Sequence, residues 1–330
     1  MAACLAGLTA TAQPKTGHRL TVSVNAYEGQ WLYLGYHYGK IKALADSVRV
    51  QQGVAVFKGP QALPGGIYFV VSPKNEILFE LPVDQQLEKD LLFELLVDRQ
   101  QQFSMQADSA RPEAVVFTGS ADNTAFQAYT RFVQQKGTAI QQAQQKLQSP
   151  GADTAALQRV IRDNNLAIQQ YRAEVIKAQP GGLLSALFAA LTEPTVPPAS
   201  AHPGGKYDST YAYRYFKGHY WVGISLADDR LLRTPFFETR VDKYFRELVS
   251  PAPDSISREA DVFLSKAKPS KEMYKWMLTH FVQAYINPPY MGQDAVFVHL
   301  FEKYINGHPE VDWFTEKYQQ YMRDRAYSLM

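Results

Sequence analysis

The chain has 330 residues, of which 46% are hydrophobic and 13% aromatic, enough for a sizeable core and, by length, for two domains. Its 34 Lys and Arg against 32 Asp and Glu give a formal net charge of +2, which argues against a nucleic-acid-binding protein, because such proteins carry a strongly basic field. Cys4 is the only cysteine, so the composition excludes an intramolecular disulfide, a CxxC redox pair and a Cys-rich zinc site.

Residues 1–15 are predicted to be the remnant of a secretory signal peptide. Residues 2–12 are uncharged and end in Ala10-Thr11-Ala12, a small-x-small pattern typical of a cleavage site. A disordered terminus rich in Ala and Thr is the alternative interpretation. No other stretch approaches the roughly 20 apolar residues that a membrane span requires. We therefore expect an exported protein of the periplasm or cell envelope, without a transmembrane segment.

Residues 16–120 are predicted to form an antiparallel β sandwich. Apolar residues alternate with polar ones, as in Leu20, Val22 and Val24, and turn residues separate many short segments of this kind. Residues 48–50 and 54–57, on either side of a Gln-Gln-Gly turn, are typical of a hairpin. No helical period of convincing length interrupts the region, which favours a sandwich or a partly open barrel.

A duplicated segment lies inside this region. The sequence ILFELPVDQQ at 77–86 is nearly repeated as LLFELLVDRQ at 91–100. The two copies are expected to pair as a hairpin. Duplication also repeats two acids, giving Glu80 with Glu94 and Asp84 with Asp98, and paired carboxylates can support catalysis or metal binding. We favour a duplicated strand whose Glu residues face solvent, because duplication alone accounts for the repeated acids.

After Ser120 the hydrophobic period changes to seven, which predicts an all-α domain over residues 121–330. Residues 121–179 are expected to form a long αα-hairpin with a break at Ser149-Pro150-Gly151 and an N-cap at Asp153. Residues 192–208 are dense in Pro and Gly and predict a loop, and residues 209–330 predict consecutive short helices. The fold class is therefore α+β multidomain.

One short block carries most of the side chains that could do chemistry. The candidate functional surface consists of His219, Trp221, Asp228, Asp229, Arg230 and Arg233. Such groups can supply general acid catalysis. The structural interpretation, which we favour, is that Asp228 or Asp229 caps a short helix and pairs with the arginines while Trp221 packs beneath. No P-loop, dinucleotide fingerprint, nucleophile elbow or metal-ligand spacing is present, so no catalytic residue, cofactor or metal is predicted.

Several aromatic residues precede and enter this block: Tyr207, Tyr211, Tyr213, Tyr215, Phe216, Tyr220 and Trp221. They can stack on sugar rings or on the aromatic side chains of a peptide. They can also belong to the core, and this is the interpretation we favour, because the neighbouring helices need an apolar partner.

Four segments together resemble a known family: GHYWVGISLADDRLLRTP at 218–235, VFTGSADNTAF at 116–126, DAVFVHLFEKY at 294–304, and Trp313. The sequence resembles the N-terminal accessory region of TlpA-type thioredoxin-like envelope proteins of Bacteroidota. The resemblance implies a β domain and a helical domain, both of unknown function, ahead of a thioredoxin domain with a WCxxC motif. Nothing in this sequence matches that motif, so no redox residue carries over. Val222-Gly223 and the duplication at 77–100 depart from the family pattern.

Three functions are therefore expected in order of preference. The first is a non-catalytic accessory or binding module of an envelope thioredoxin-like protein, with the redox domain absent from this chain and a protein or that thioredoxin module as its partner. The second is a hydrolase or metal-assisted enzyme that uses His219, Asp228 and Asp229. The third is a coiled-coil scaffold that dimerises through residues 121–179. The sequence does not indicate an oligomeric state.

Overall fold

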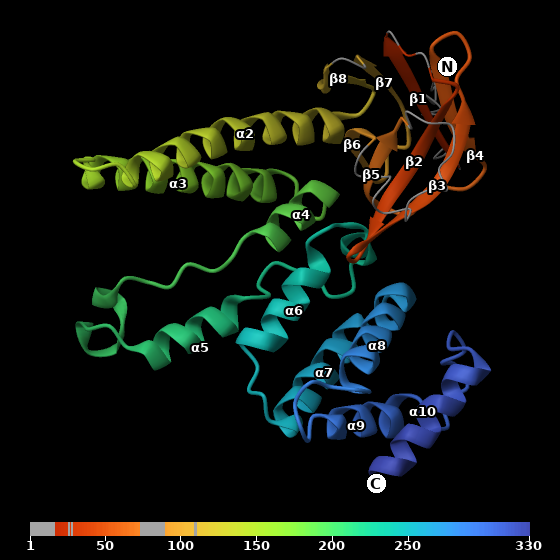
Figure 1. Cartoon of the computed structure of the whole chain (residues 1–330), viewed down its shortest axis with the longest axis vertical. Coiled ribbons are helices and arrows are strands. Elements are labelled where there is room, and N and C mark those ends of the chain that lie inside the picture. Colours follow the sequence, from red (N-terminus) through yellow and green to blue (C-terminus); the bar gives the residue numbers. More distant parts are fainter. Residues whose placement is uncertain (1–16, 26, 28, 73–89, 109–110) are drawn as a thin grey trace, which may run out of the picture.

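The computed structural model describes residues 17–25, 27, 29–72, 90–108 and 111–330. Within these ranges the chain begins as a β region and continues as helices (Figure 1). This arrangement confirms the predicted α+β class. The expected signal peptide, Cys4 and the first copy of the duplicated segment lie outside the described residues, as does the pairing of the two copies. The division into domains at residue 120 stays a prediction.

The β region consists of two four-stranded sheets that pack face to face (Figure 1). The first has the order β4 (Val54–Gly59), β1 (His18–Asn25), β7 (Gln102–Asp108), β8 (Arg111–Thr118). The second has the order β3 (Ile41–Arg49), β2 (Trp31–Tyr38), β5 (Gly66–Val71), β6 (Leu91–Val97). Alternating residues of both sheets, such as Leu20, Leu34, Phe57 and Leu95, are fully buried between them, as the period of two predicted.

Two details of strand pairing differ from the sequence prediction. β1 and β7 run parallel, with Leu20 opposite Phe103, whereas the other strand pairs are antiparallel. The hairpin predicted over residues 48–57 is wrong, because β3 pairs with β2 and β4 pairs with β1. Only an isolated bridge joins Gln51 to Val54. The turn at Gln52 and Gly53, whose φ angles are 51° and 77°, carries the chain from one sheet to the other.

The predicted helical hairpin is confirmed. It consists of α2 (Ala121–Leu147) and α3 (Thr154–Ala178), which lie side by side and extend away from the sandwich (Figure 1). Ser120 caps α2, with its Oγ accepting from the N–H of Asn123 at 3.3 Å. Asp153 caps α3 as predicted, accepting from the N–H of Ala156 at 3.0 Å.

The helix α4 (Leu183–Leu191) was not predicted. Its sequence, LLSALFAAL, is apolar on all sides and therefore lacks the periodic pattern that identifies an amphipathic helix. The predicted loop at 192–208 holds two short 3-10 turns, η1 (Ala199–Ala201) and η2 (Pro203–Gly205).

The rest of the chain is a series of short helices around one apolar core. They are α5 (Ser209–His219), the 3-10 helix η3 (Asp229–Arg233), α6 (Phe237–Glu247), α7 (Pro253–Ala267), α8 (Lys271–Tyr285), α9 (Asp294–Tyr304) and α10 (Glu316–Leu329). In the described part of the chain, no helix combines the length and the apolar character that a membrane crossing needs.

The sandwich joins the helices through β5, β6 and the turn between β2 and β3. Ile67 and Leu96 point out of the sandwich and belong to the helical core. The N–H of Gly39 donates to the carbonyl of Leu232 at 2.8 Å. A Cβ at Gly66 would lie 2.2 Å from the Cβ of Arg233, so only glycine allows this close approach. The short helix η3 is therefore wedged at the joint between the two regions.

Candidate functional site

The structure divides the six candidate residues between two places. His219 lies at the end of α5, and Trp221 lies just after it and packs against the helical core. Asp228, Asp229, Arg230 and Arg233 lie at η3, against the β sandwich. The compact block that the sequence suggested is therefore two separate structural features.

Arg230 lies at the centre of an ion-pair cluster that crosses the joint. Its guanidinium Nη2 lies 2.6 Å from Oδ2 of Asp228, and its Nη1 lies 3.0 Å from Oδ2 of Asp98, an acid of the second copy of the duplicated segment. Asp228 also caps η3 by accepting from the N–H of Arg230 at 3.3 Å. The three side chains are 12–19% exposed. Asp228 and Arg230 thus connect η3 to the strand region, which agrees with the predicted cap and ion pair, whereas Trp221 lies elsewhere, against α6 and α7.

Arg233 makes a second set of contacts at the joint. Its side chain is only 5% exposed and forms an ion pair with Glu272 of α8, while Oδ2 of Asp229, one turn earlier, lies 3.8 Å from Nη1 of Arg233. Burial, a hydrogen bond to Glu272 and the negative charge of Glu272 raise the pKa of Asp229. Asp229 is therefore the acid of this block whose charge the fold accommodates poorly.

At about pH 7, replacing Asp229 with asparagine is expected to raise the melting temperature by about 1 °C to 2 °C. A raised pKa in the folded state means that ionisation of Asp229 opposes folding above its ordinary pKa. This penalty disappears as the pH falls through the raised value, so the advantage of Asp229→Asn is expected to shrink at about pH 4. Differential scanning calorimetry at both pH values measures the difference.

The matched control is Asp228→Asn, on the adjacent residue. It is expected to lower the melting temperature at neutral pH, because Asp228 holds Arg230 through charge-assisted hydrogen bonds. Equal losses of stability in both variants would contradict the assignment of opposite roles to the two aspartates.

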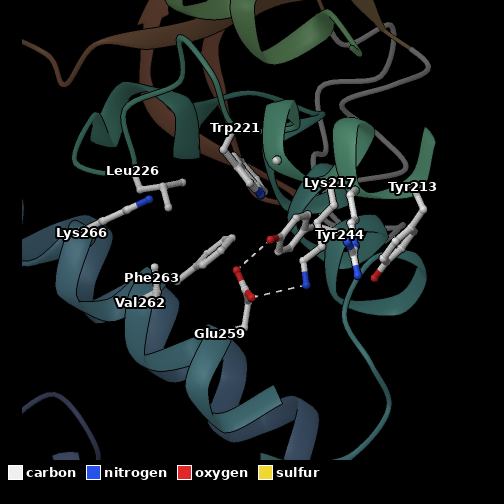
Figure 2. Close-up of a pocket in the computed structure, with 11 residues that line it drawn as sticks. Tyr213, Lys217, Trp221, Leu226, Tyr244, Glu259, Val262, Phe263 and Lys266 are labelled. Atoms are coloured by element: carbon white, nitrogen blue, oxygen red, sulfur yellow. Dashed lines mark hydrogen bonds and ion pairs between the residues drawn. The ribbon is translucent and has the colours of Figure 1, made fainter. Parts of the chain in front are cut away.

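Trp221 lies in the wall of a pocket with a volume of about 370 Å³, hereafter the Trp221 pocket (Figure 2). Cavities that bind ligands begin at about this size. It is lined by α5, the segment after α5, α6 and α7, through Tyr213, Arg214, Lys217, Gly218, Trp221, Leu226, Tyr244, Glu259, Val262, Phe263 and Lys266. The pocket therefore lies within the helical region rather than at the joint.

Three aromatic side chains form the inner wall of the pocket. The centroid of the Trp221 ring lies 5.2 Å from that of Phe263 and 5.6 Å from that of Tyr244, and both pairs are edge to face. Tyr244 and Phe263 are buried. The Tyr244 hydroxyl donates to Glu259 at 2.7 Å, and burial together with this hydrogen bond raises the pKa of Tyr244 far above its ordinary value. The tyrosine is therefore a fixed donor and a rigid part of the wall.

The rim of the pocket is cationic. The lining includes three cations, Arg214, Lys217 and Lys266, and one carboxylate, Glu259, which leaves a formal excess of two positive charges. Lys217 Nζ lies 3.6 Å from Glu259, so these two charges offset each other (Figure 2). Arg214 and Lys266 have no ion-pair partner among the described residues.

Arg240 of α6 lies behind the aromatic wall. Its guanidinium carbon Cζ lies 4.3 Å from the centroid of the Tyr220 ring and 5.5 Å from that of the Trp221 ring. The residue is 7% exposed, and burial lowers the pKa of its guanidinium. Among the described residues, its guanidinium donates to the main-chain carbonyls of Ala190 and Tyr220, and its Nε has no hydrogen-bond partner. A buried cation without a paired carboxylate thus lies next to the pocket.

His219 does not line the pocket. Its ring stacks on Tyr215 one turn earlier at 3.9 Å, and its Nδ1 lies 2.7 Å from the carbonyl of Tyr215. It is exposed at the end of α5. Of the six candidate residues, Trp221 is the one that lines the Trp221 pocket.

Sequence reasoning missed the α7 side of the pocket, although a signal was present. Glu259, Phe263 and Lys266 recur at intervals of four and three, which places them on one face of a helix. Tyr213 and Lys217 have the same relation on α5. Helical periodicity shows which side chains share a face, but it does not show which two faces meet.

The fold and the pocket define an α+β protein with an aromatic, cation-rimmed cavity in its helical region. No protein-family model matches the sequence, and no curated protein matches it. Within the described residues, no group of three or more His, Cys, Asp or Glu is placed to hold a metal ion. The resemblance to the accessory region of TlpA-type proteins stays a prediction.

Proposed function

We propose that the protein is a non-catalytic binding module, the accessory part of an envelope thioredoxin-like protein, and that it holds a protein partner through the Trp221 pocket. The observation that carries this proposal is the pocket itself, whose aromatic wall consists of the buried Tyr244 and Phe263 and the partly buried Trp221 under a cationic rim. Tryptophan, tyrosine and arginine are enriched among the interface residues that contribute most of the binding free energy.

The state of the acids in the candidate block supports binding over catalysis. A general acid or base must have its carboxylate within reach of a substrate. Both carboxylate oxygens of Asp228 accept from Arg230, and Asp229 lies against Arg233 and Glu272. His219 is held by its own helix, on Tyr215. These contacts assign the three residues a structural role in the proposal.

The scaffold alternative has less support. Tyr129, on the apolar stripe of α2, packs on Tyr171 of α3 and on Phe188 of α4. The ring centroids lie 5.5 Å and 4.2 Å apart, respectively. Arg172 donates to the Tyr129 hydroxyl at 2.7 Å and to the carbonyl of Leu191 at 3.0 Å. The base of the hairpin thus already has a partner within the chain, which leaves less of the stripe for a second copy.

Titration with a separately purified TlpA-type thioredoxin domain tests the proposal. We expect binding with a dissociation constant of about 1 μM to 100 μM, as in transient interfaces, measured by isothermal titration calorimetry on the oxidised and the reduced domain. Gly218→Trp is expected to weaken binding at least about tenfold, because Gly218 lies on the pocket rim and a Cβ there meets no atom within 4 Å.

Gly137→Trp provides the matched control. Gly137 is also a helical glycine with no atom within 4 Å of an added Cβ, but it lies on α2, outside the pocket. It should leave binding unchanged. The proposal is wrong if neither redox state of the domain binds, if both tryptophan variants bind as the unmodified chain does, or if the chain turns over a substrate through Asp228.

A further inference from the structure

We infer that the segment that the Trp221 pocket holds is acidic and carries an aromatic side chain, so that carboxylates flank a ring. This inference rests on the proposed function and specifies the chemistry of the partner. Three features of the pocket support it: its aromatic wall, its unpaired rim cations and the buried guanidinium behind the wall.

The walls select a ring. Trp221, Phe263 and Leu226 offer apolar surface, and Val262 continues that surface to the mouth, where its side chain is 44% exposed. A volume of about 370 Å³ lies near the lower limit of ligand cavities, so it suits one side chain with its neighbours rather than a large ligand. An aromatic ring placed there gains edge-to-face contacts in addition to the burial of its surface.

The rim selects negative charge. Glu259 offsets Lys217 at 3.6 Å, whereas Arg214 and Lys266 are exposed and have no carboxylate partner among the described residues. Because Arg214 lies on α5 and Lys266 on α7, the two unpaired cations come from different walls of the pocket. Carboxylates on both sides of an inserted ring can therefore each meet a cation.

Arg240 strengthens this preference from behind. Its guanidinium is 5.5 Å from the ring of Trp221 and meets main-chain carbonyls and ring faces, but no carboxylate among the described residues. Water screens the field of a buried charge poorly, so the positive potential extends into the cavity. The carboxylate of Glu193 attracts this charge without forming an ion pair with it, and an anion in the pocket adds to that compensation.

Both parts of the ligand are needed to use the whole pocket. A free anion without a ring would leave the aromatic wall uncovered. A neutral ring would leave Arg214 and Lys266 unpaired and would not use the field of Arg240. An acidic segment with a ring satisfies the wall and the charges together, which identifies a protein segment rather than an inorganic ion.

Three end-capped peptides, DEFED, NQFQN and DEAED, test the inference by isothermal titration calorimetry. DEFED is expected to bind at least about tenfold more tightly than the neutral peptide and than the peptide without a ring. Its affinity is expected to fall as salt rises from about 50 mM to about 300 mM, because exposed charges are screened.

Variants of the rim cations refine the test. Arg214→Gln and Lys266→Gln are each expected to weaken DEFED about threefold and to leave NQFQN unchanged. Lys146→Gln, an exposed lysine at the end of α2, provides the matched control and should alter neither peptide. These exposed positions avoid the loss of folding that replacement of the buried Arg240 risks.

The outcomes separate this inference from the proposed function. If NQFQN binds as tightly as DEFED and Gly218→Trp blocks both, the pocket binds a partner but the assigned charge is wrong. If DEAED binds as tightly as DEFED, the inference that the partner segment carries an aromatic side chain is wrong. If no peptide binds while the thioredoxin domain binds in a manner sensitive to Gly218→Trp, the inference fails and the proposed function stands. If nothing binds, both fail.

Discussion

Replacement of Arg230 with methionine is expected to lower the free energy of unfolding by about 4 kcal/mol, because it leaves two nearly buried carboxylates without their cation. Asp98 and Asp228 are 12% and 15% exposed and both face the Arg230 guanidinium. Methionine retains most of the aliphatic volume, so the loss reports the charge rather than a cavity. Urea denaturation followed by circular dichroism measures the change.

A double-mutant cycle identifies the interaction across the joint. Asp98→Asn alone is expected to destabilise the protein, and in the Arg230→Met background it should instead recover stability, because it removes one of the stranded charges. Arg246→Met is the matched control: its side chain is 68% exposed and pairs with Glu247 beside it, so we expect little loss of stability. A loss as small as this for Arg230→Met would show that the cluster does not hold the joint.

The fold was predictable where hydrophobic periodicity is strong. The alternation in Leu20, Val22 and Val24 placed β1, and the period of seven from Phe126 to Leu147 placed α2. Prediction from periodicity failed in two places. The helix at 183–191 is buried on nearly every side and therefore has no period, and the turn at 52–53 changes sheets, which alternation cannot reveal because each strand reads the same whichever neighbour it pairs with.

The candidate block was predictable only in its local part. The Asp228 cap depends on residues two positions apart, so the sequence contains it. The partner of Arg230 across the joint, Asp98, lies 132 residues earlier in the chain. Nothing local signals that pairing, and the duplication drew attention to Asp84 as the partner of Asp98. The Trp221 pocket has the same limit, because α5 and α7 meet only through tertiary packing.

Asn123→Ala is expected to cost about 3 kcal/mol, because it removes both partners of a buried backbone unit. Asn123 is 1% exposed, and its side-chain amide bonds the main chain of β6, an edge strand of its sheet, as a neighbouring strand would. The Asn123 Oδ1 accepts from the N–H of Leu96 at 2.7 Å, and the Nδ2 donates to the carbonyl of Leu96 at 2.8 Å. Urea denaturation measures the loss, and hydrogen exchange at Leu96 locates it.

Asn123→Asp separates hydrogen bonding from side-chain volume. An ionised aspartate can accept from the N–H of Leu96 but cannot donate to its carbonyl, so this variant should be unstable at neutral pH and recover partly in acid, where a protonated carboxyl donates again. Asn164→Ala, which removes a half-buried amide on α3 that donates to the carbonyl of Val160, is expected to cost below about 0.5 kcal/mol. Equal losses at positions 123 and 164 would mean that the edge of β6 does not depend on α2. A loss confined to position 123, with faster exchange at Leu96, would instead place the first connection between sandwich and helices at the start of α2, before the chain reaches η3.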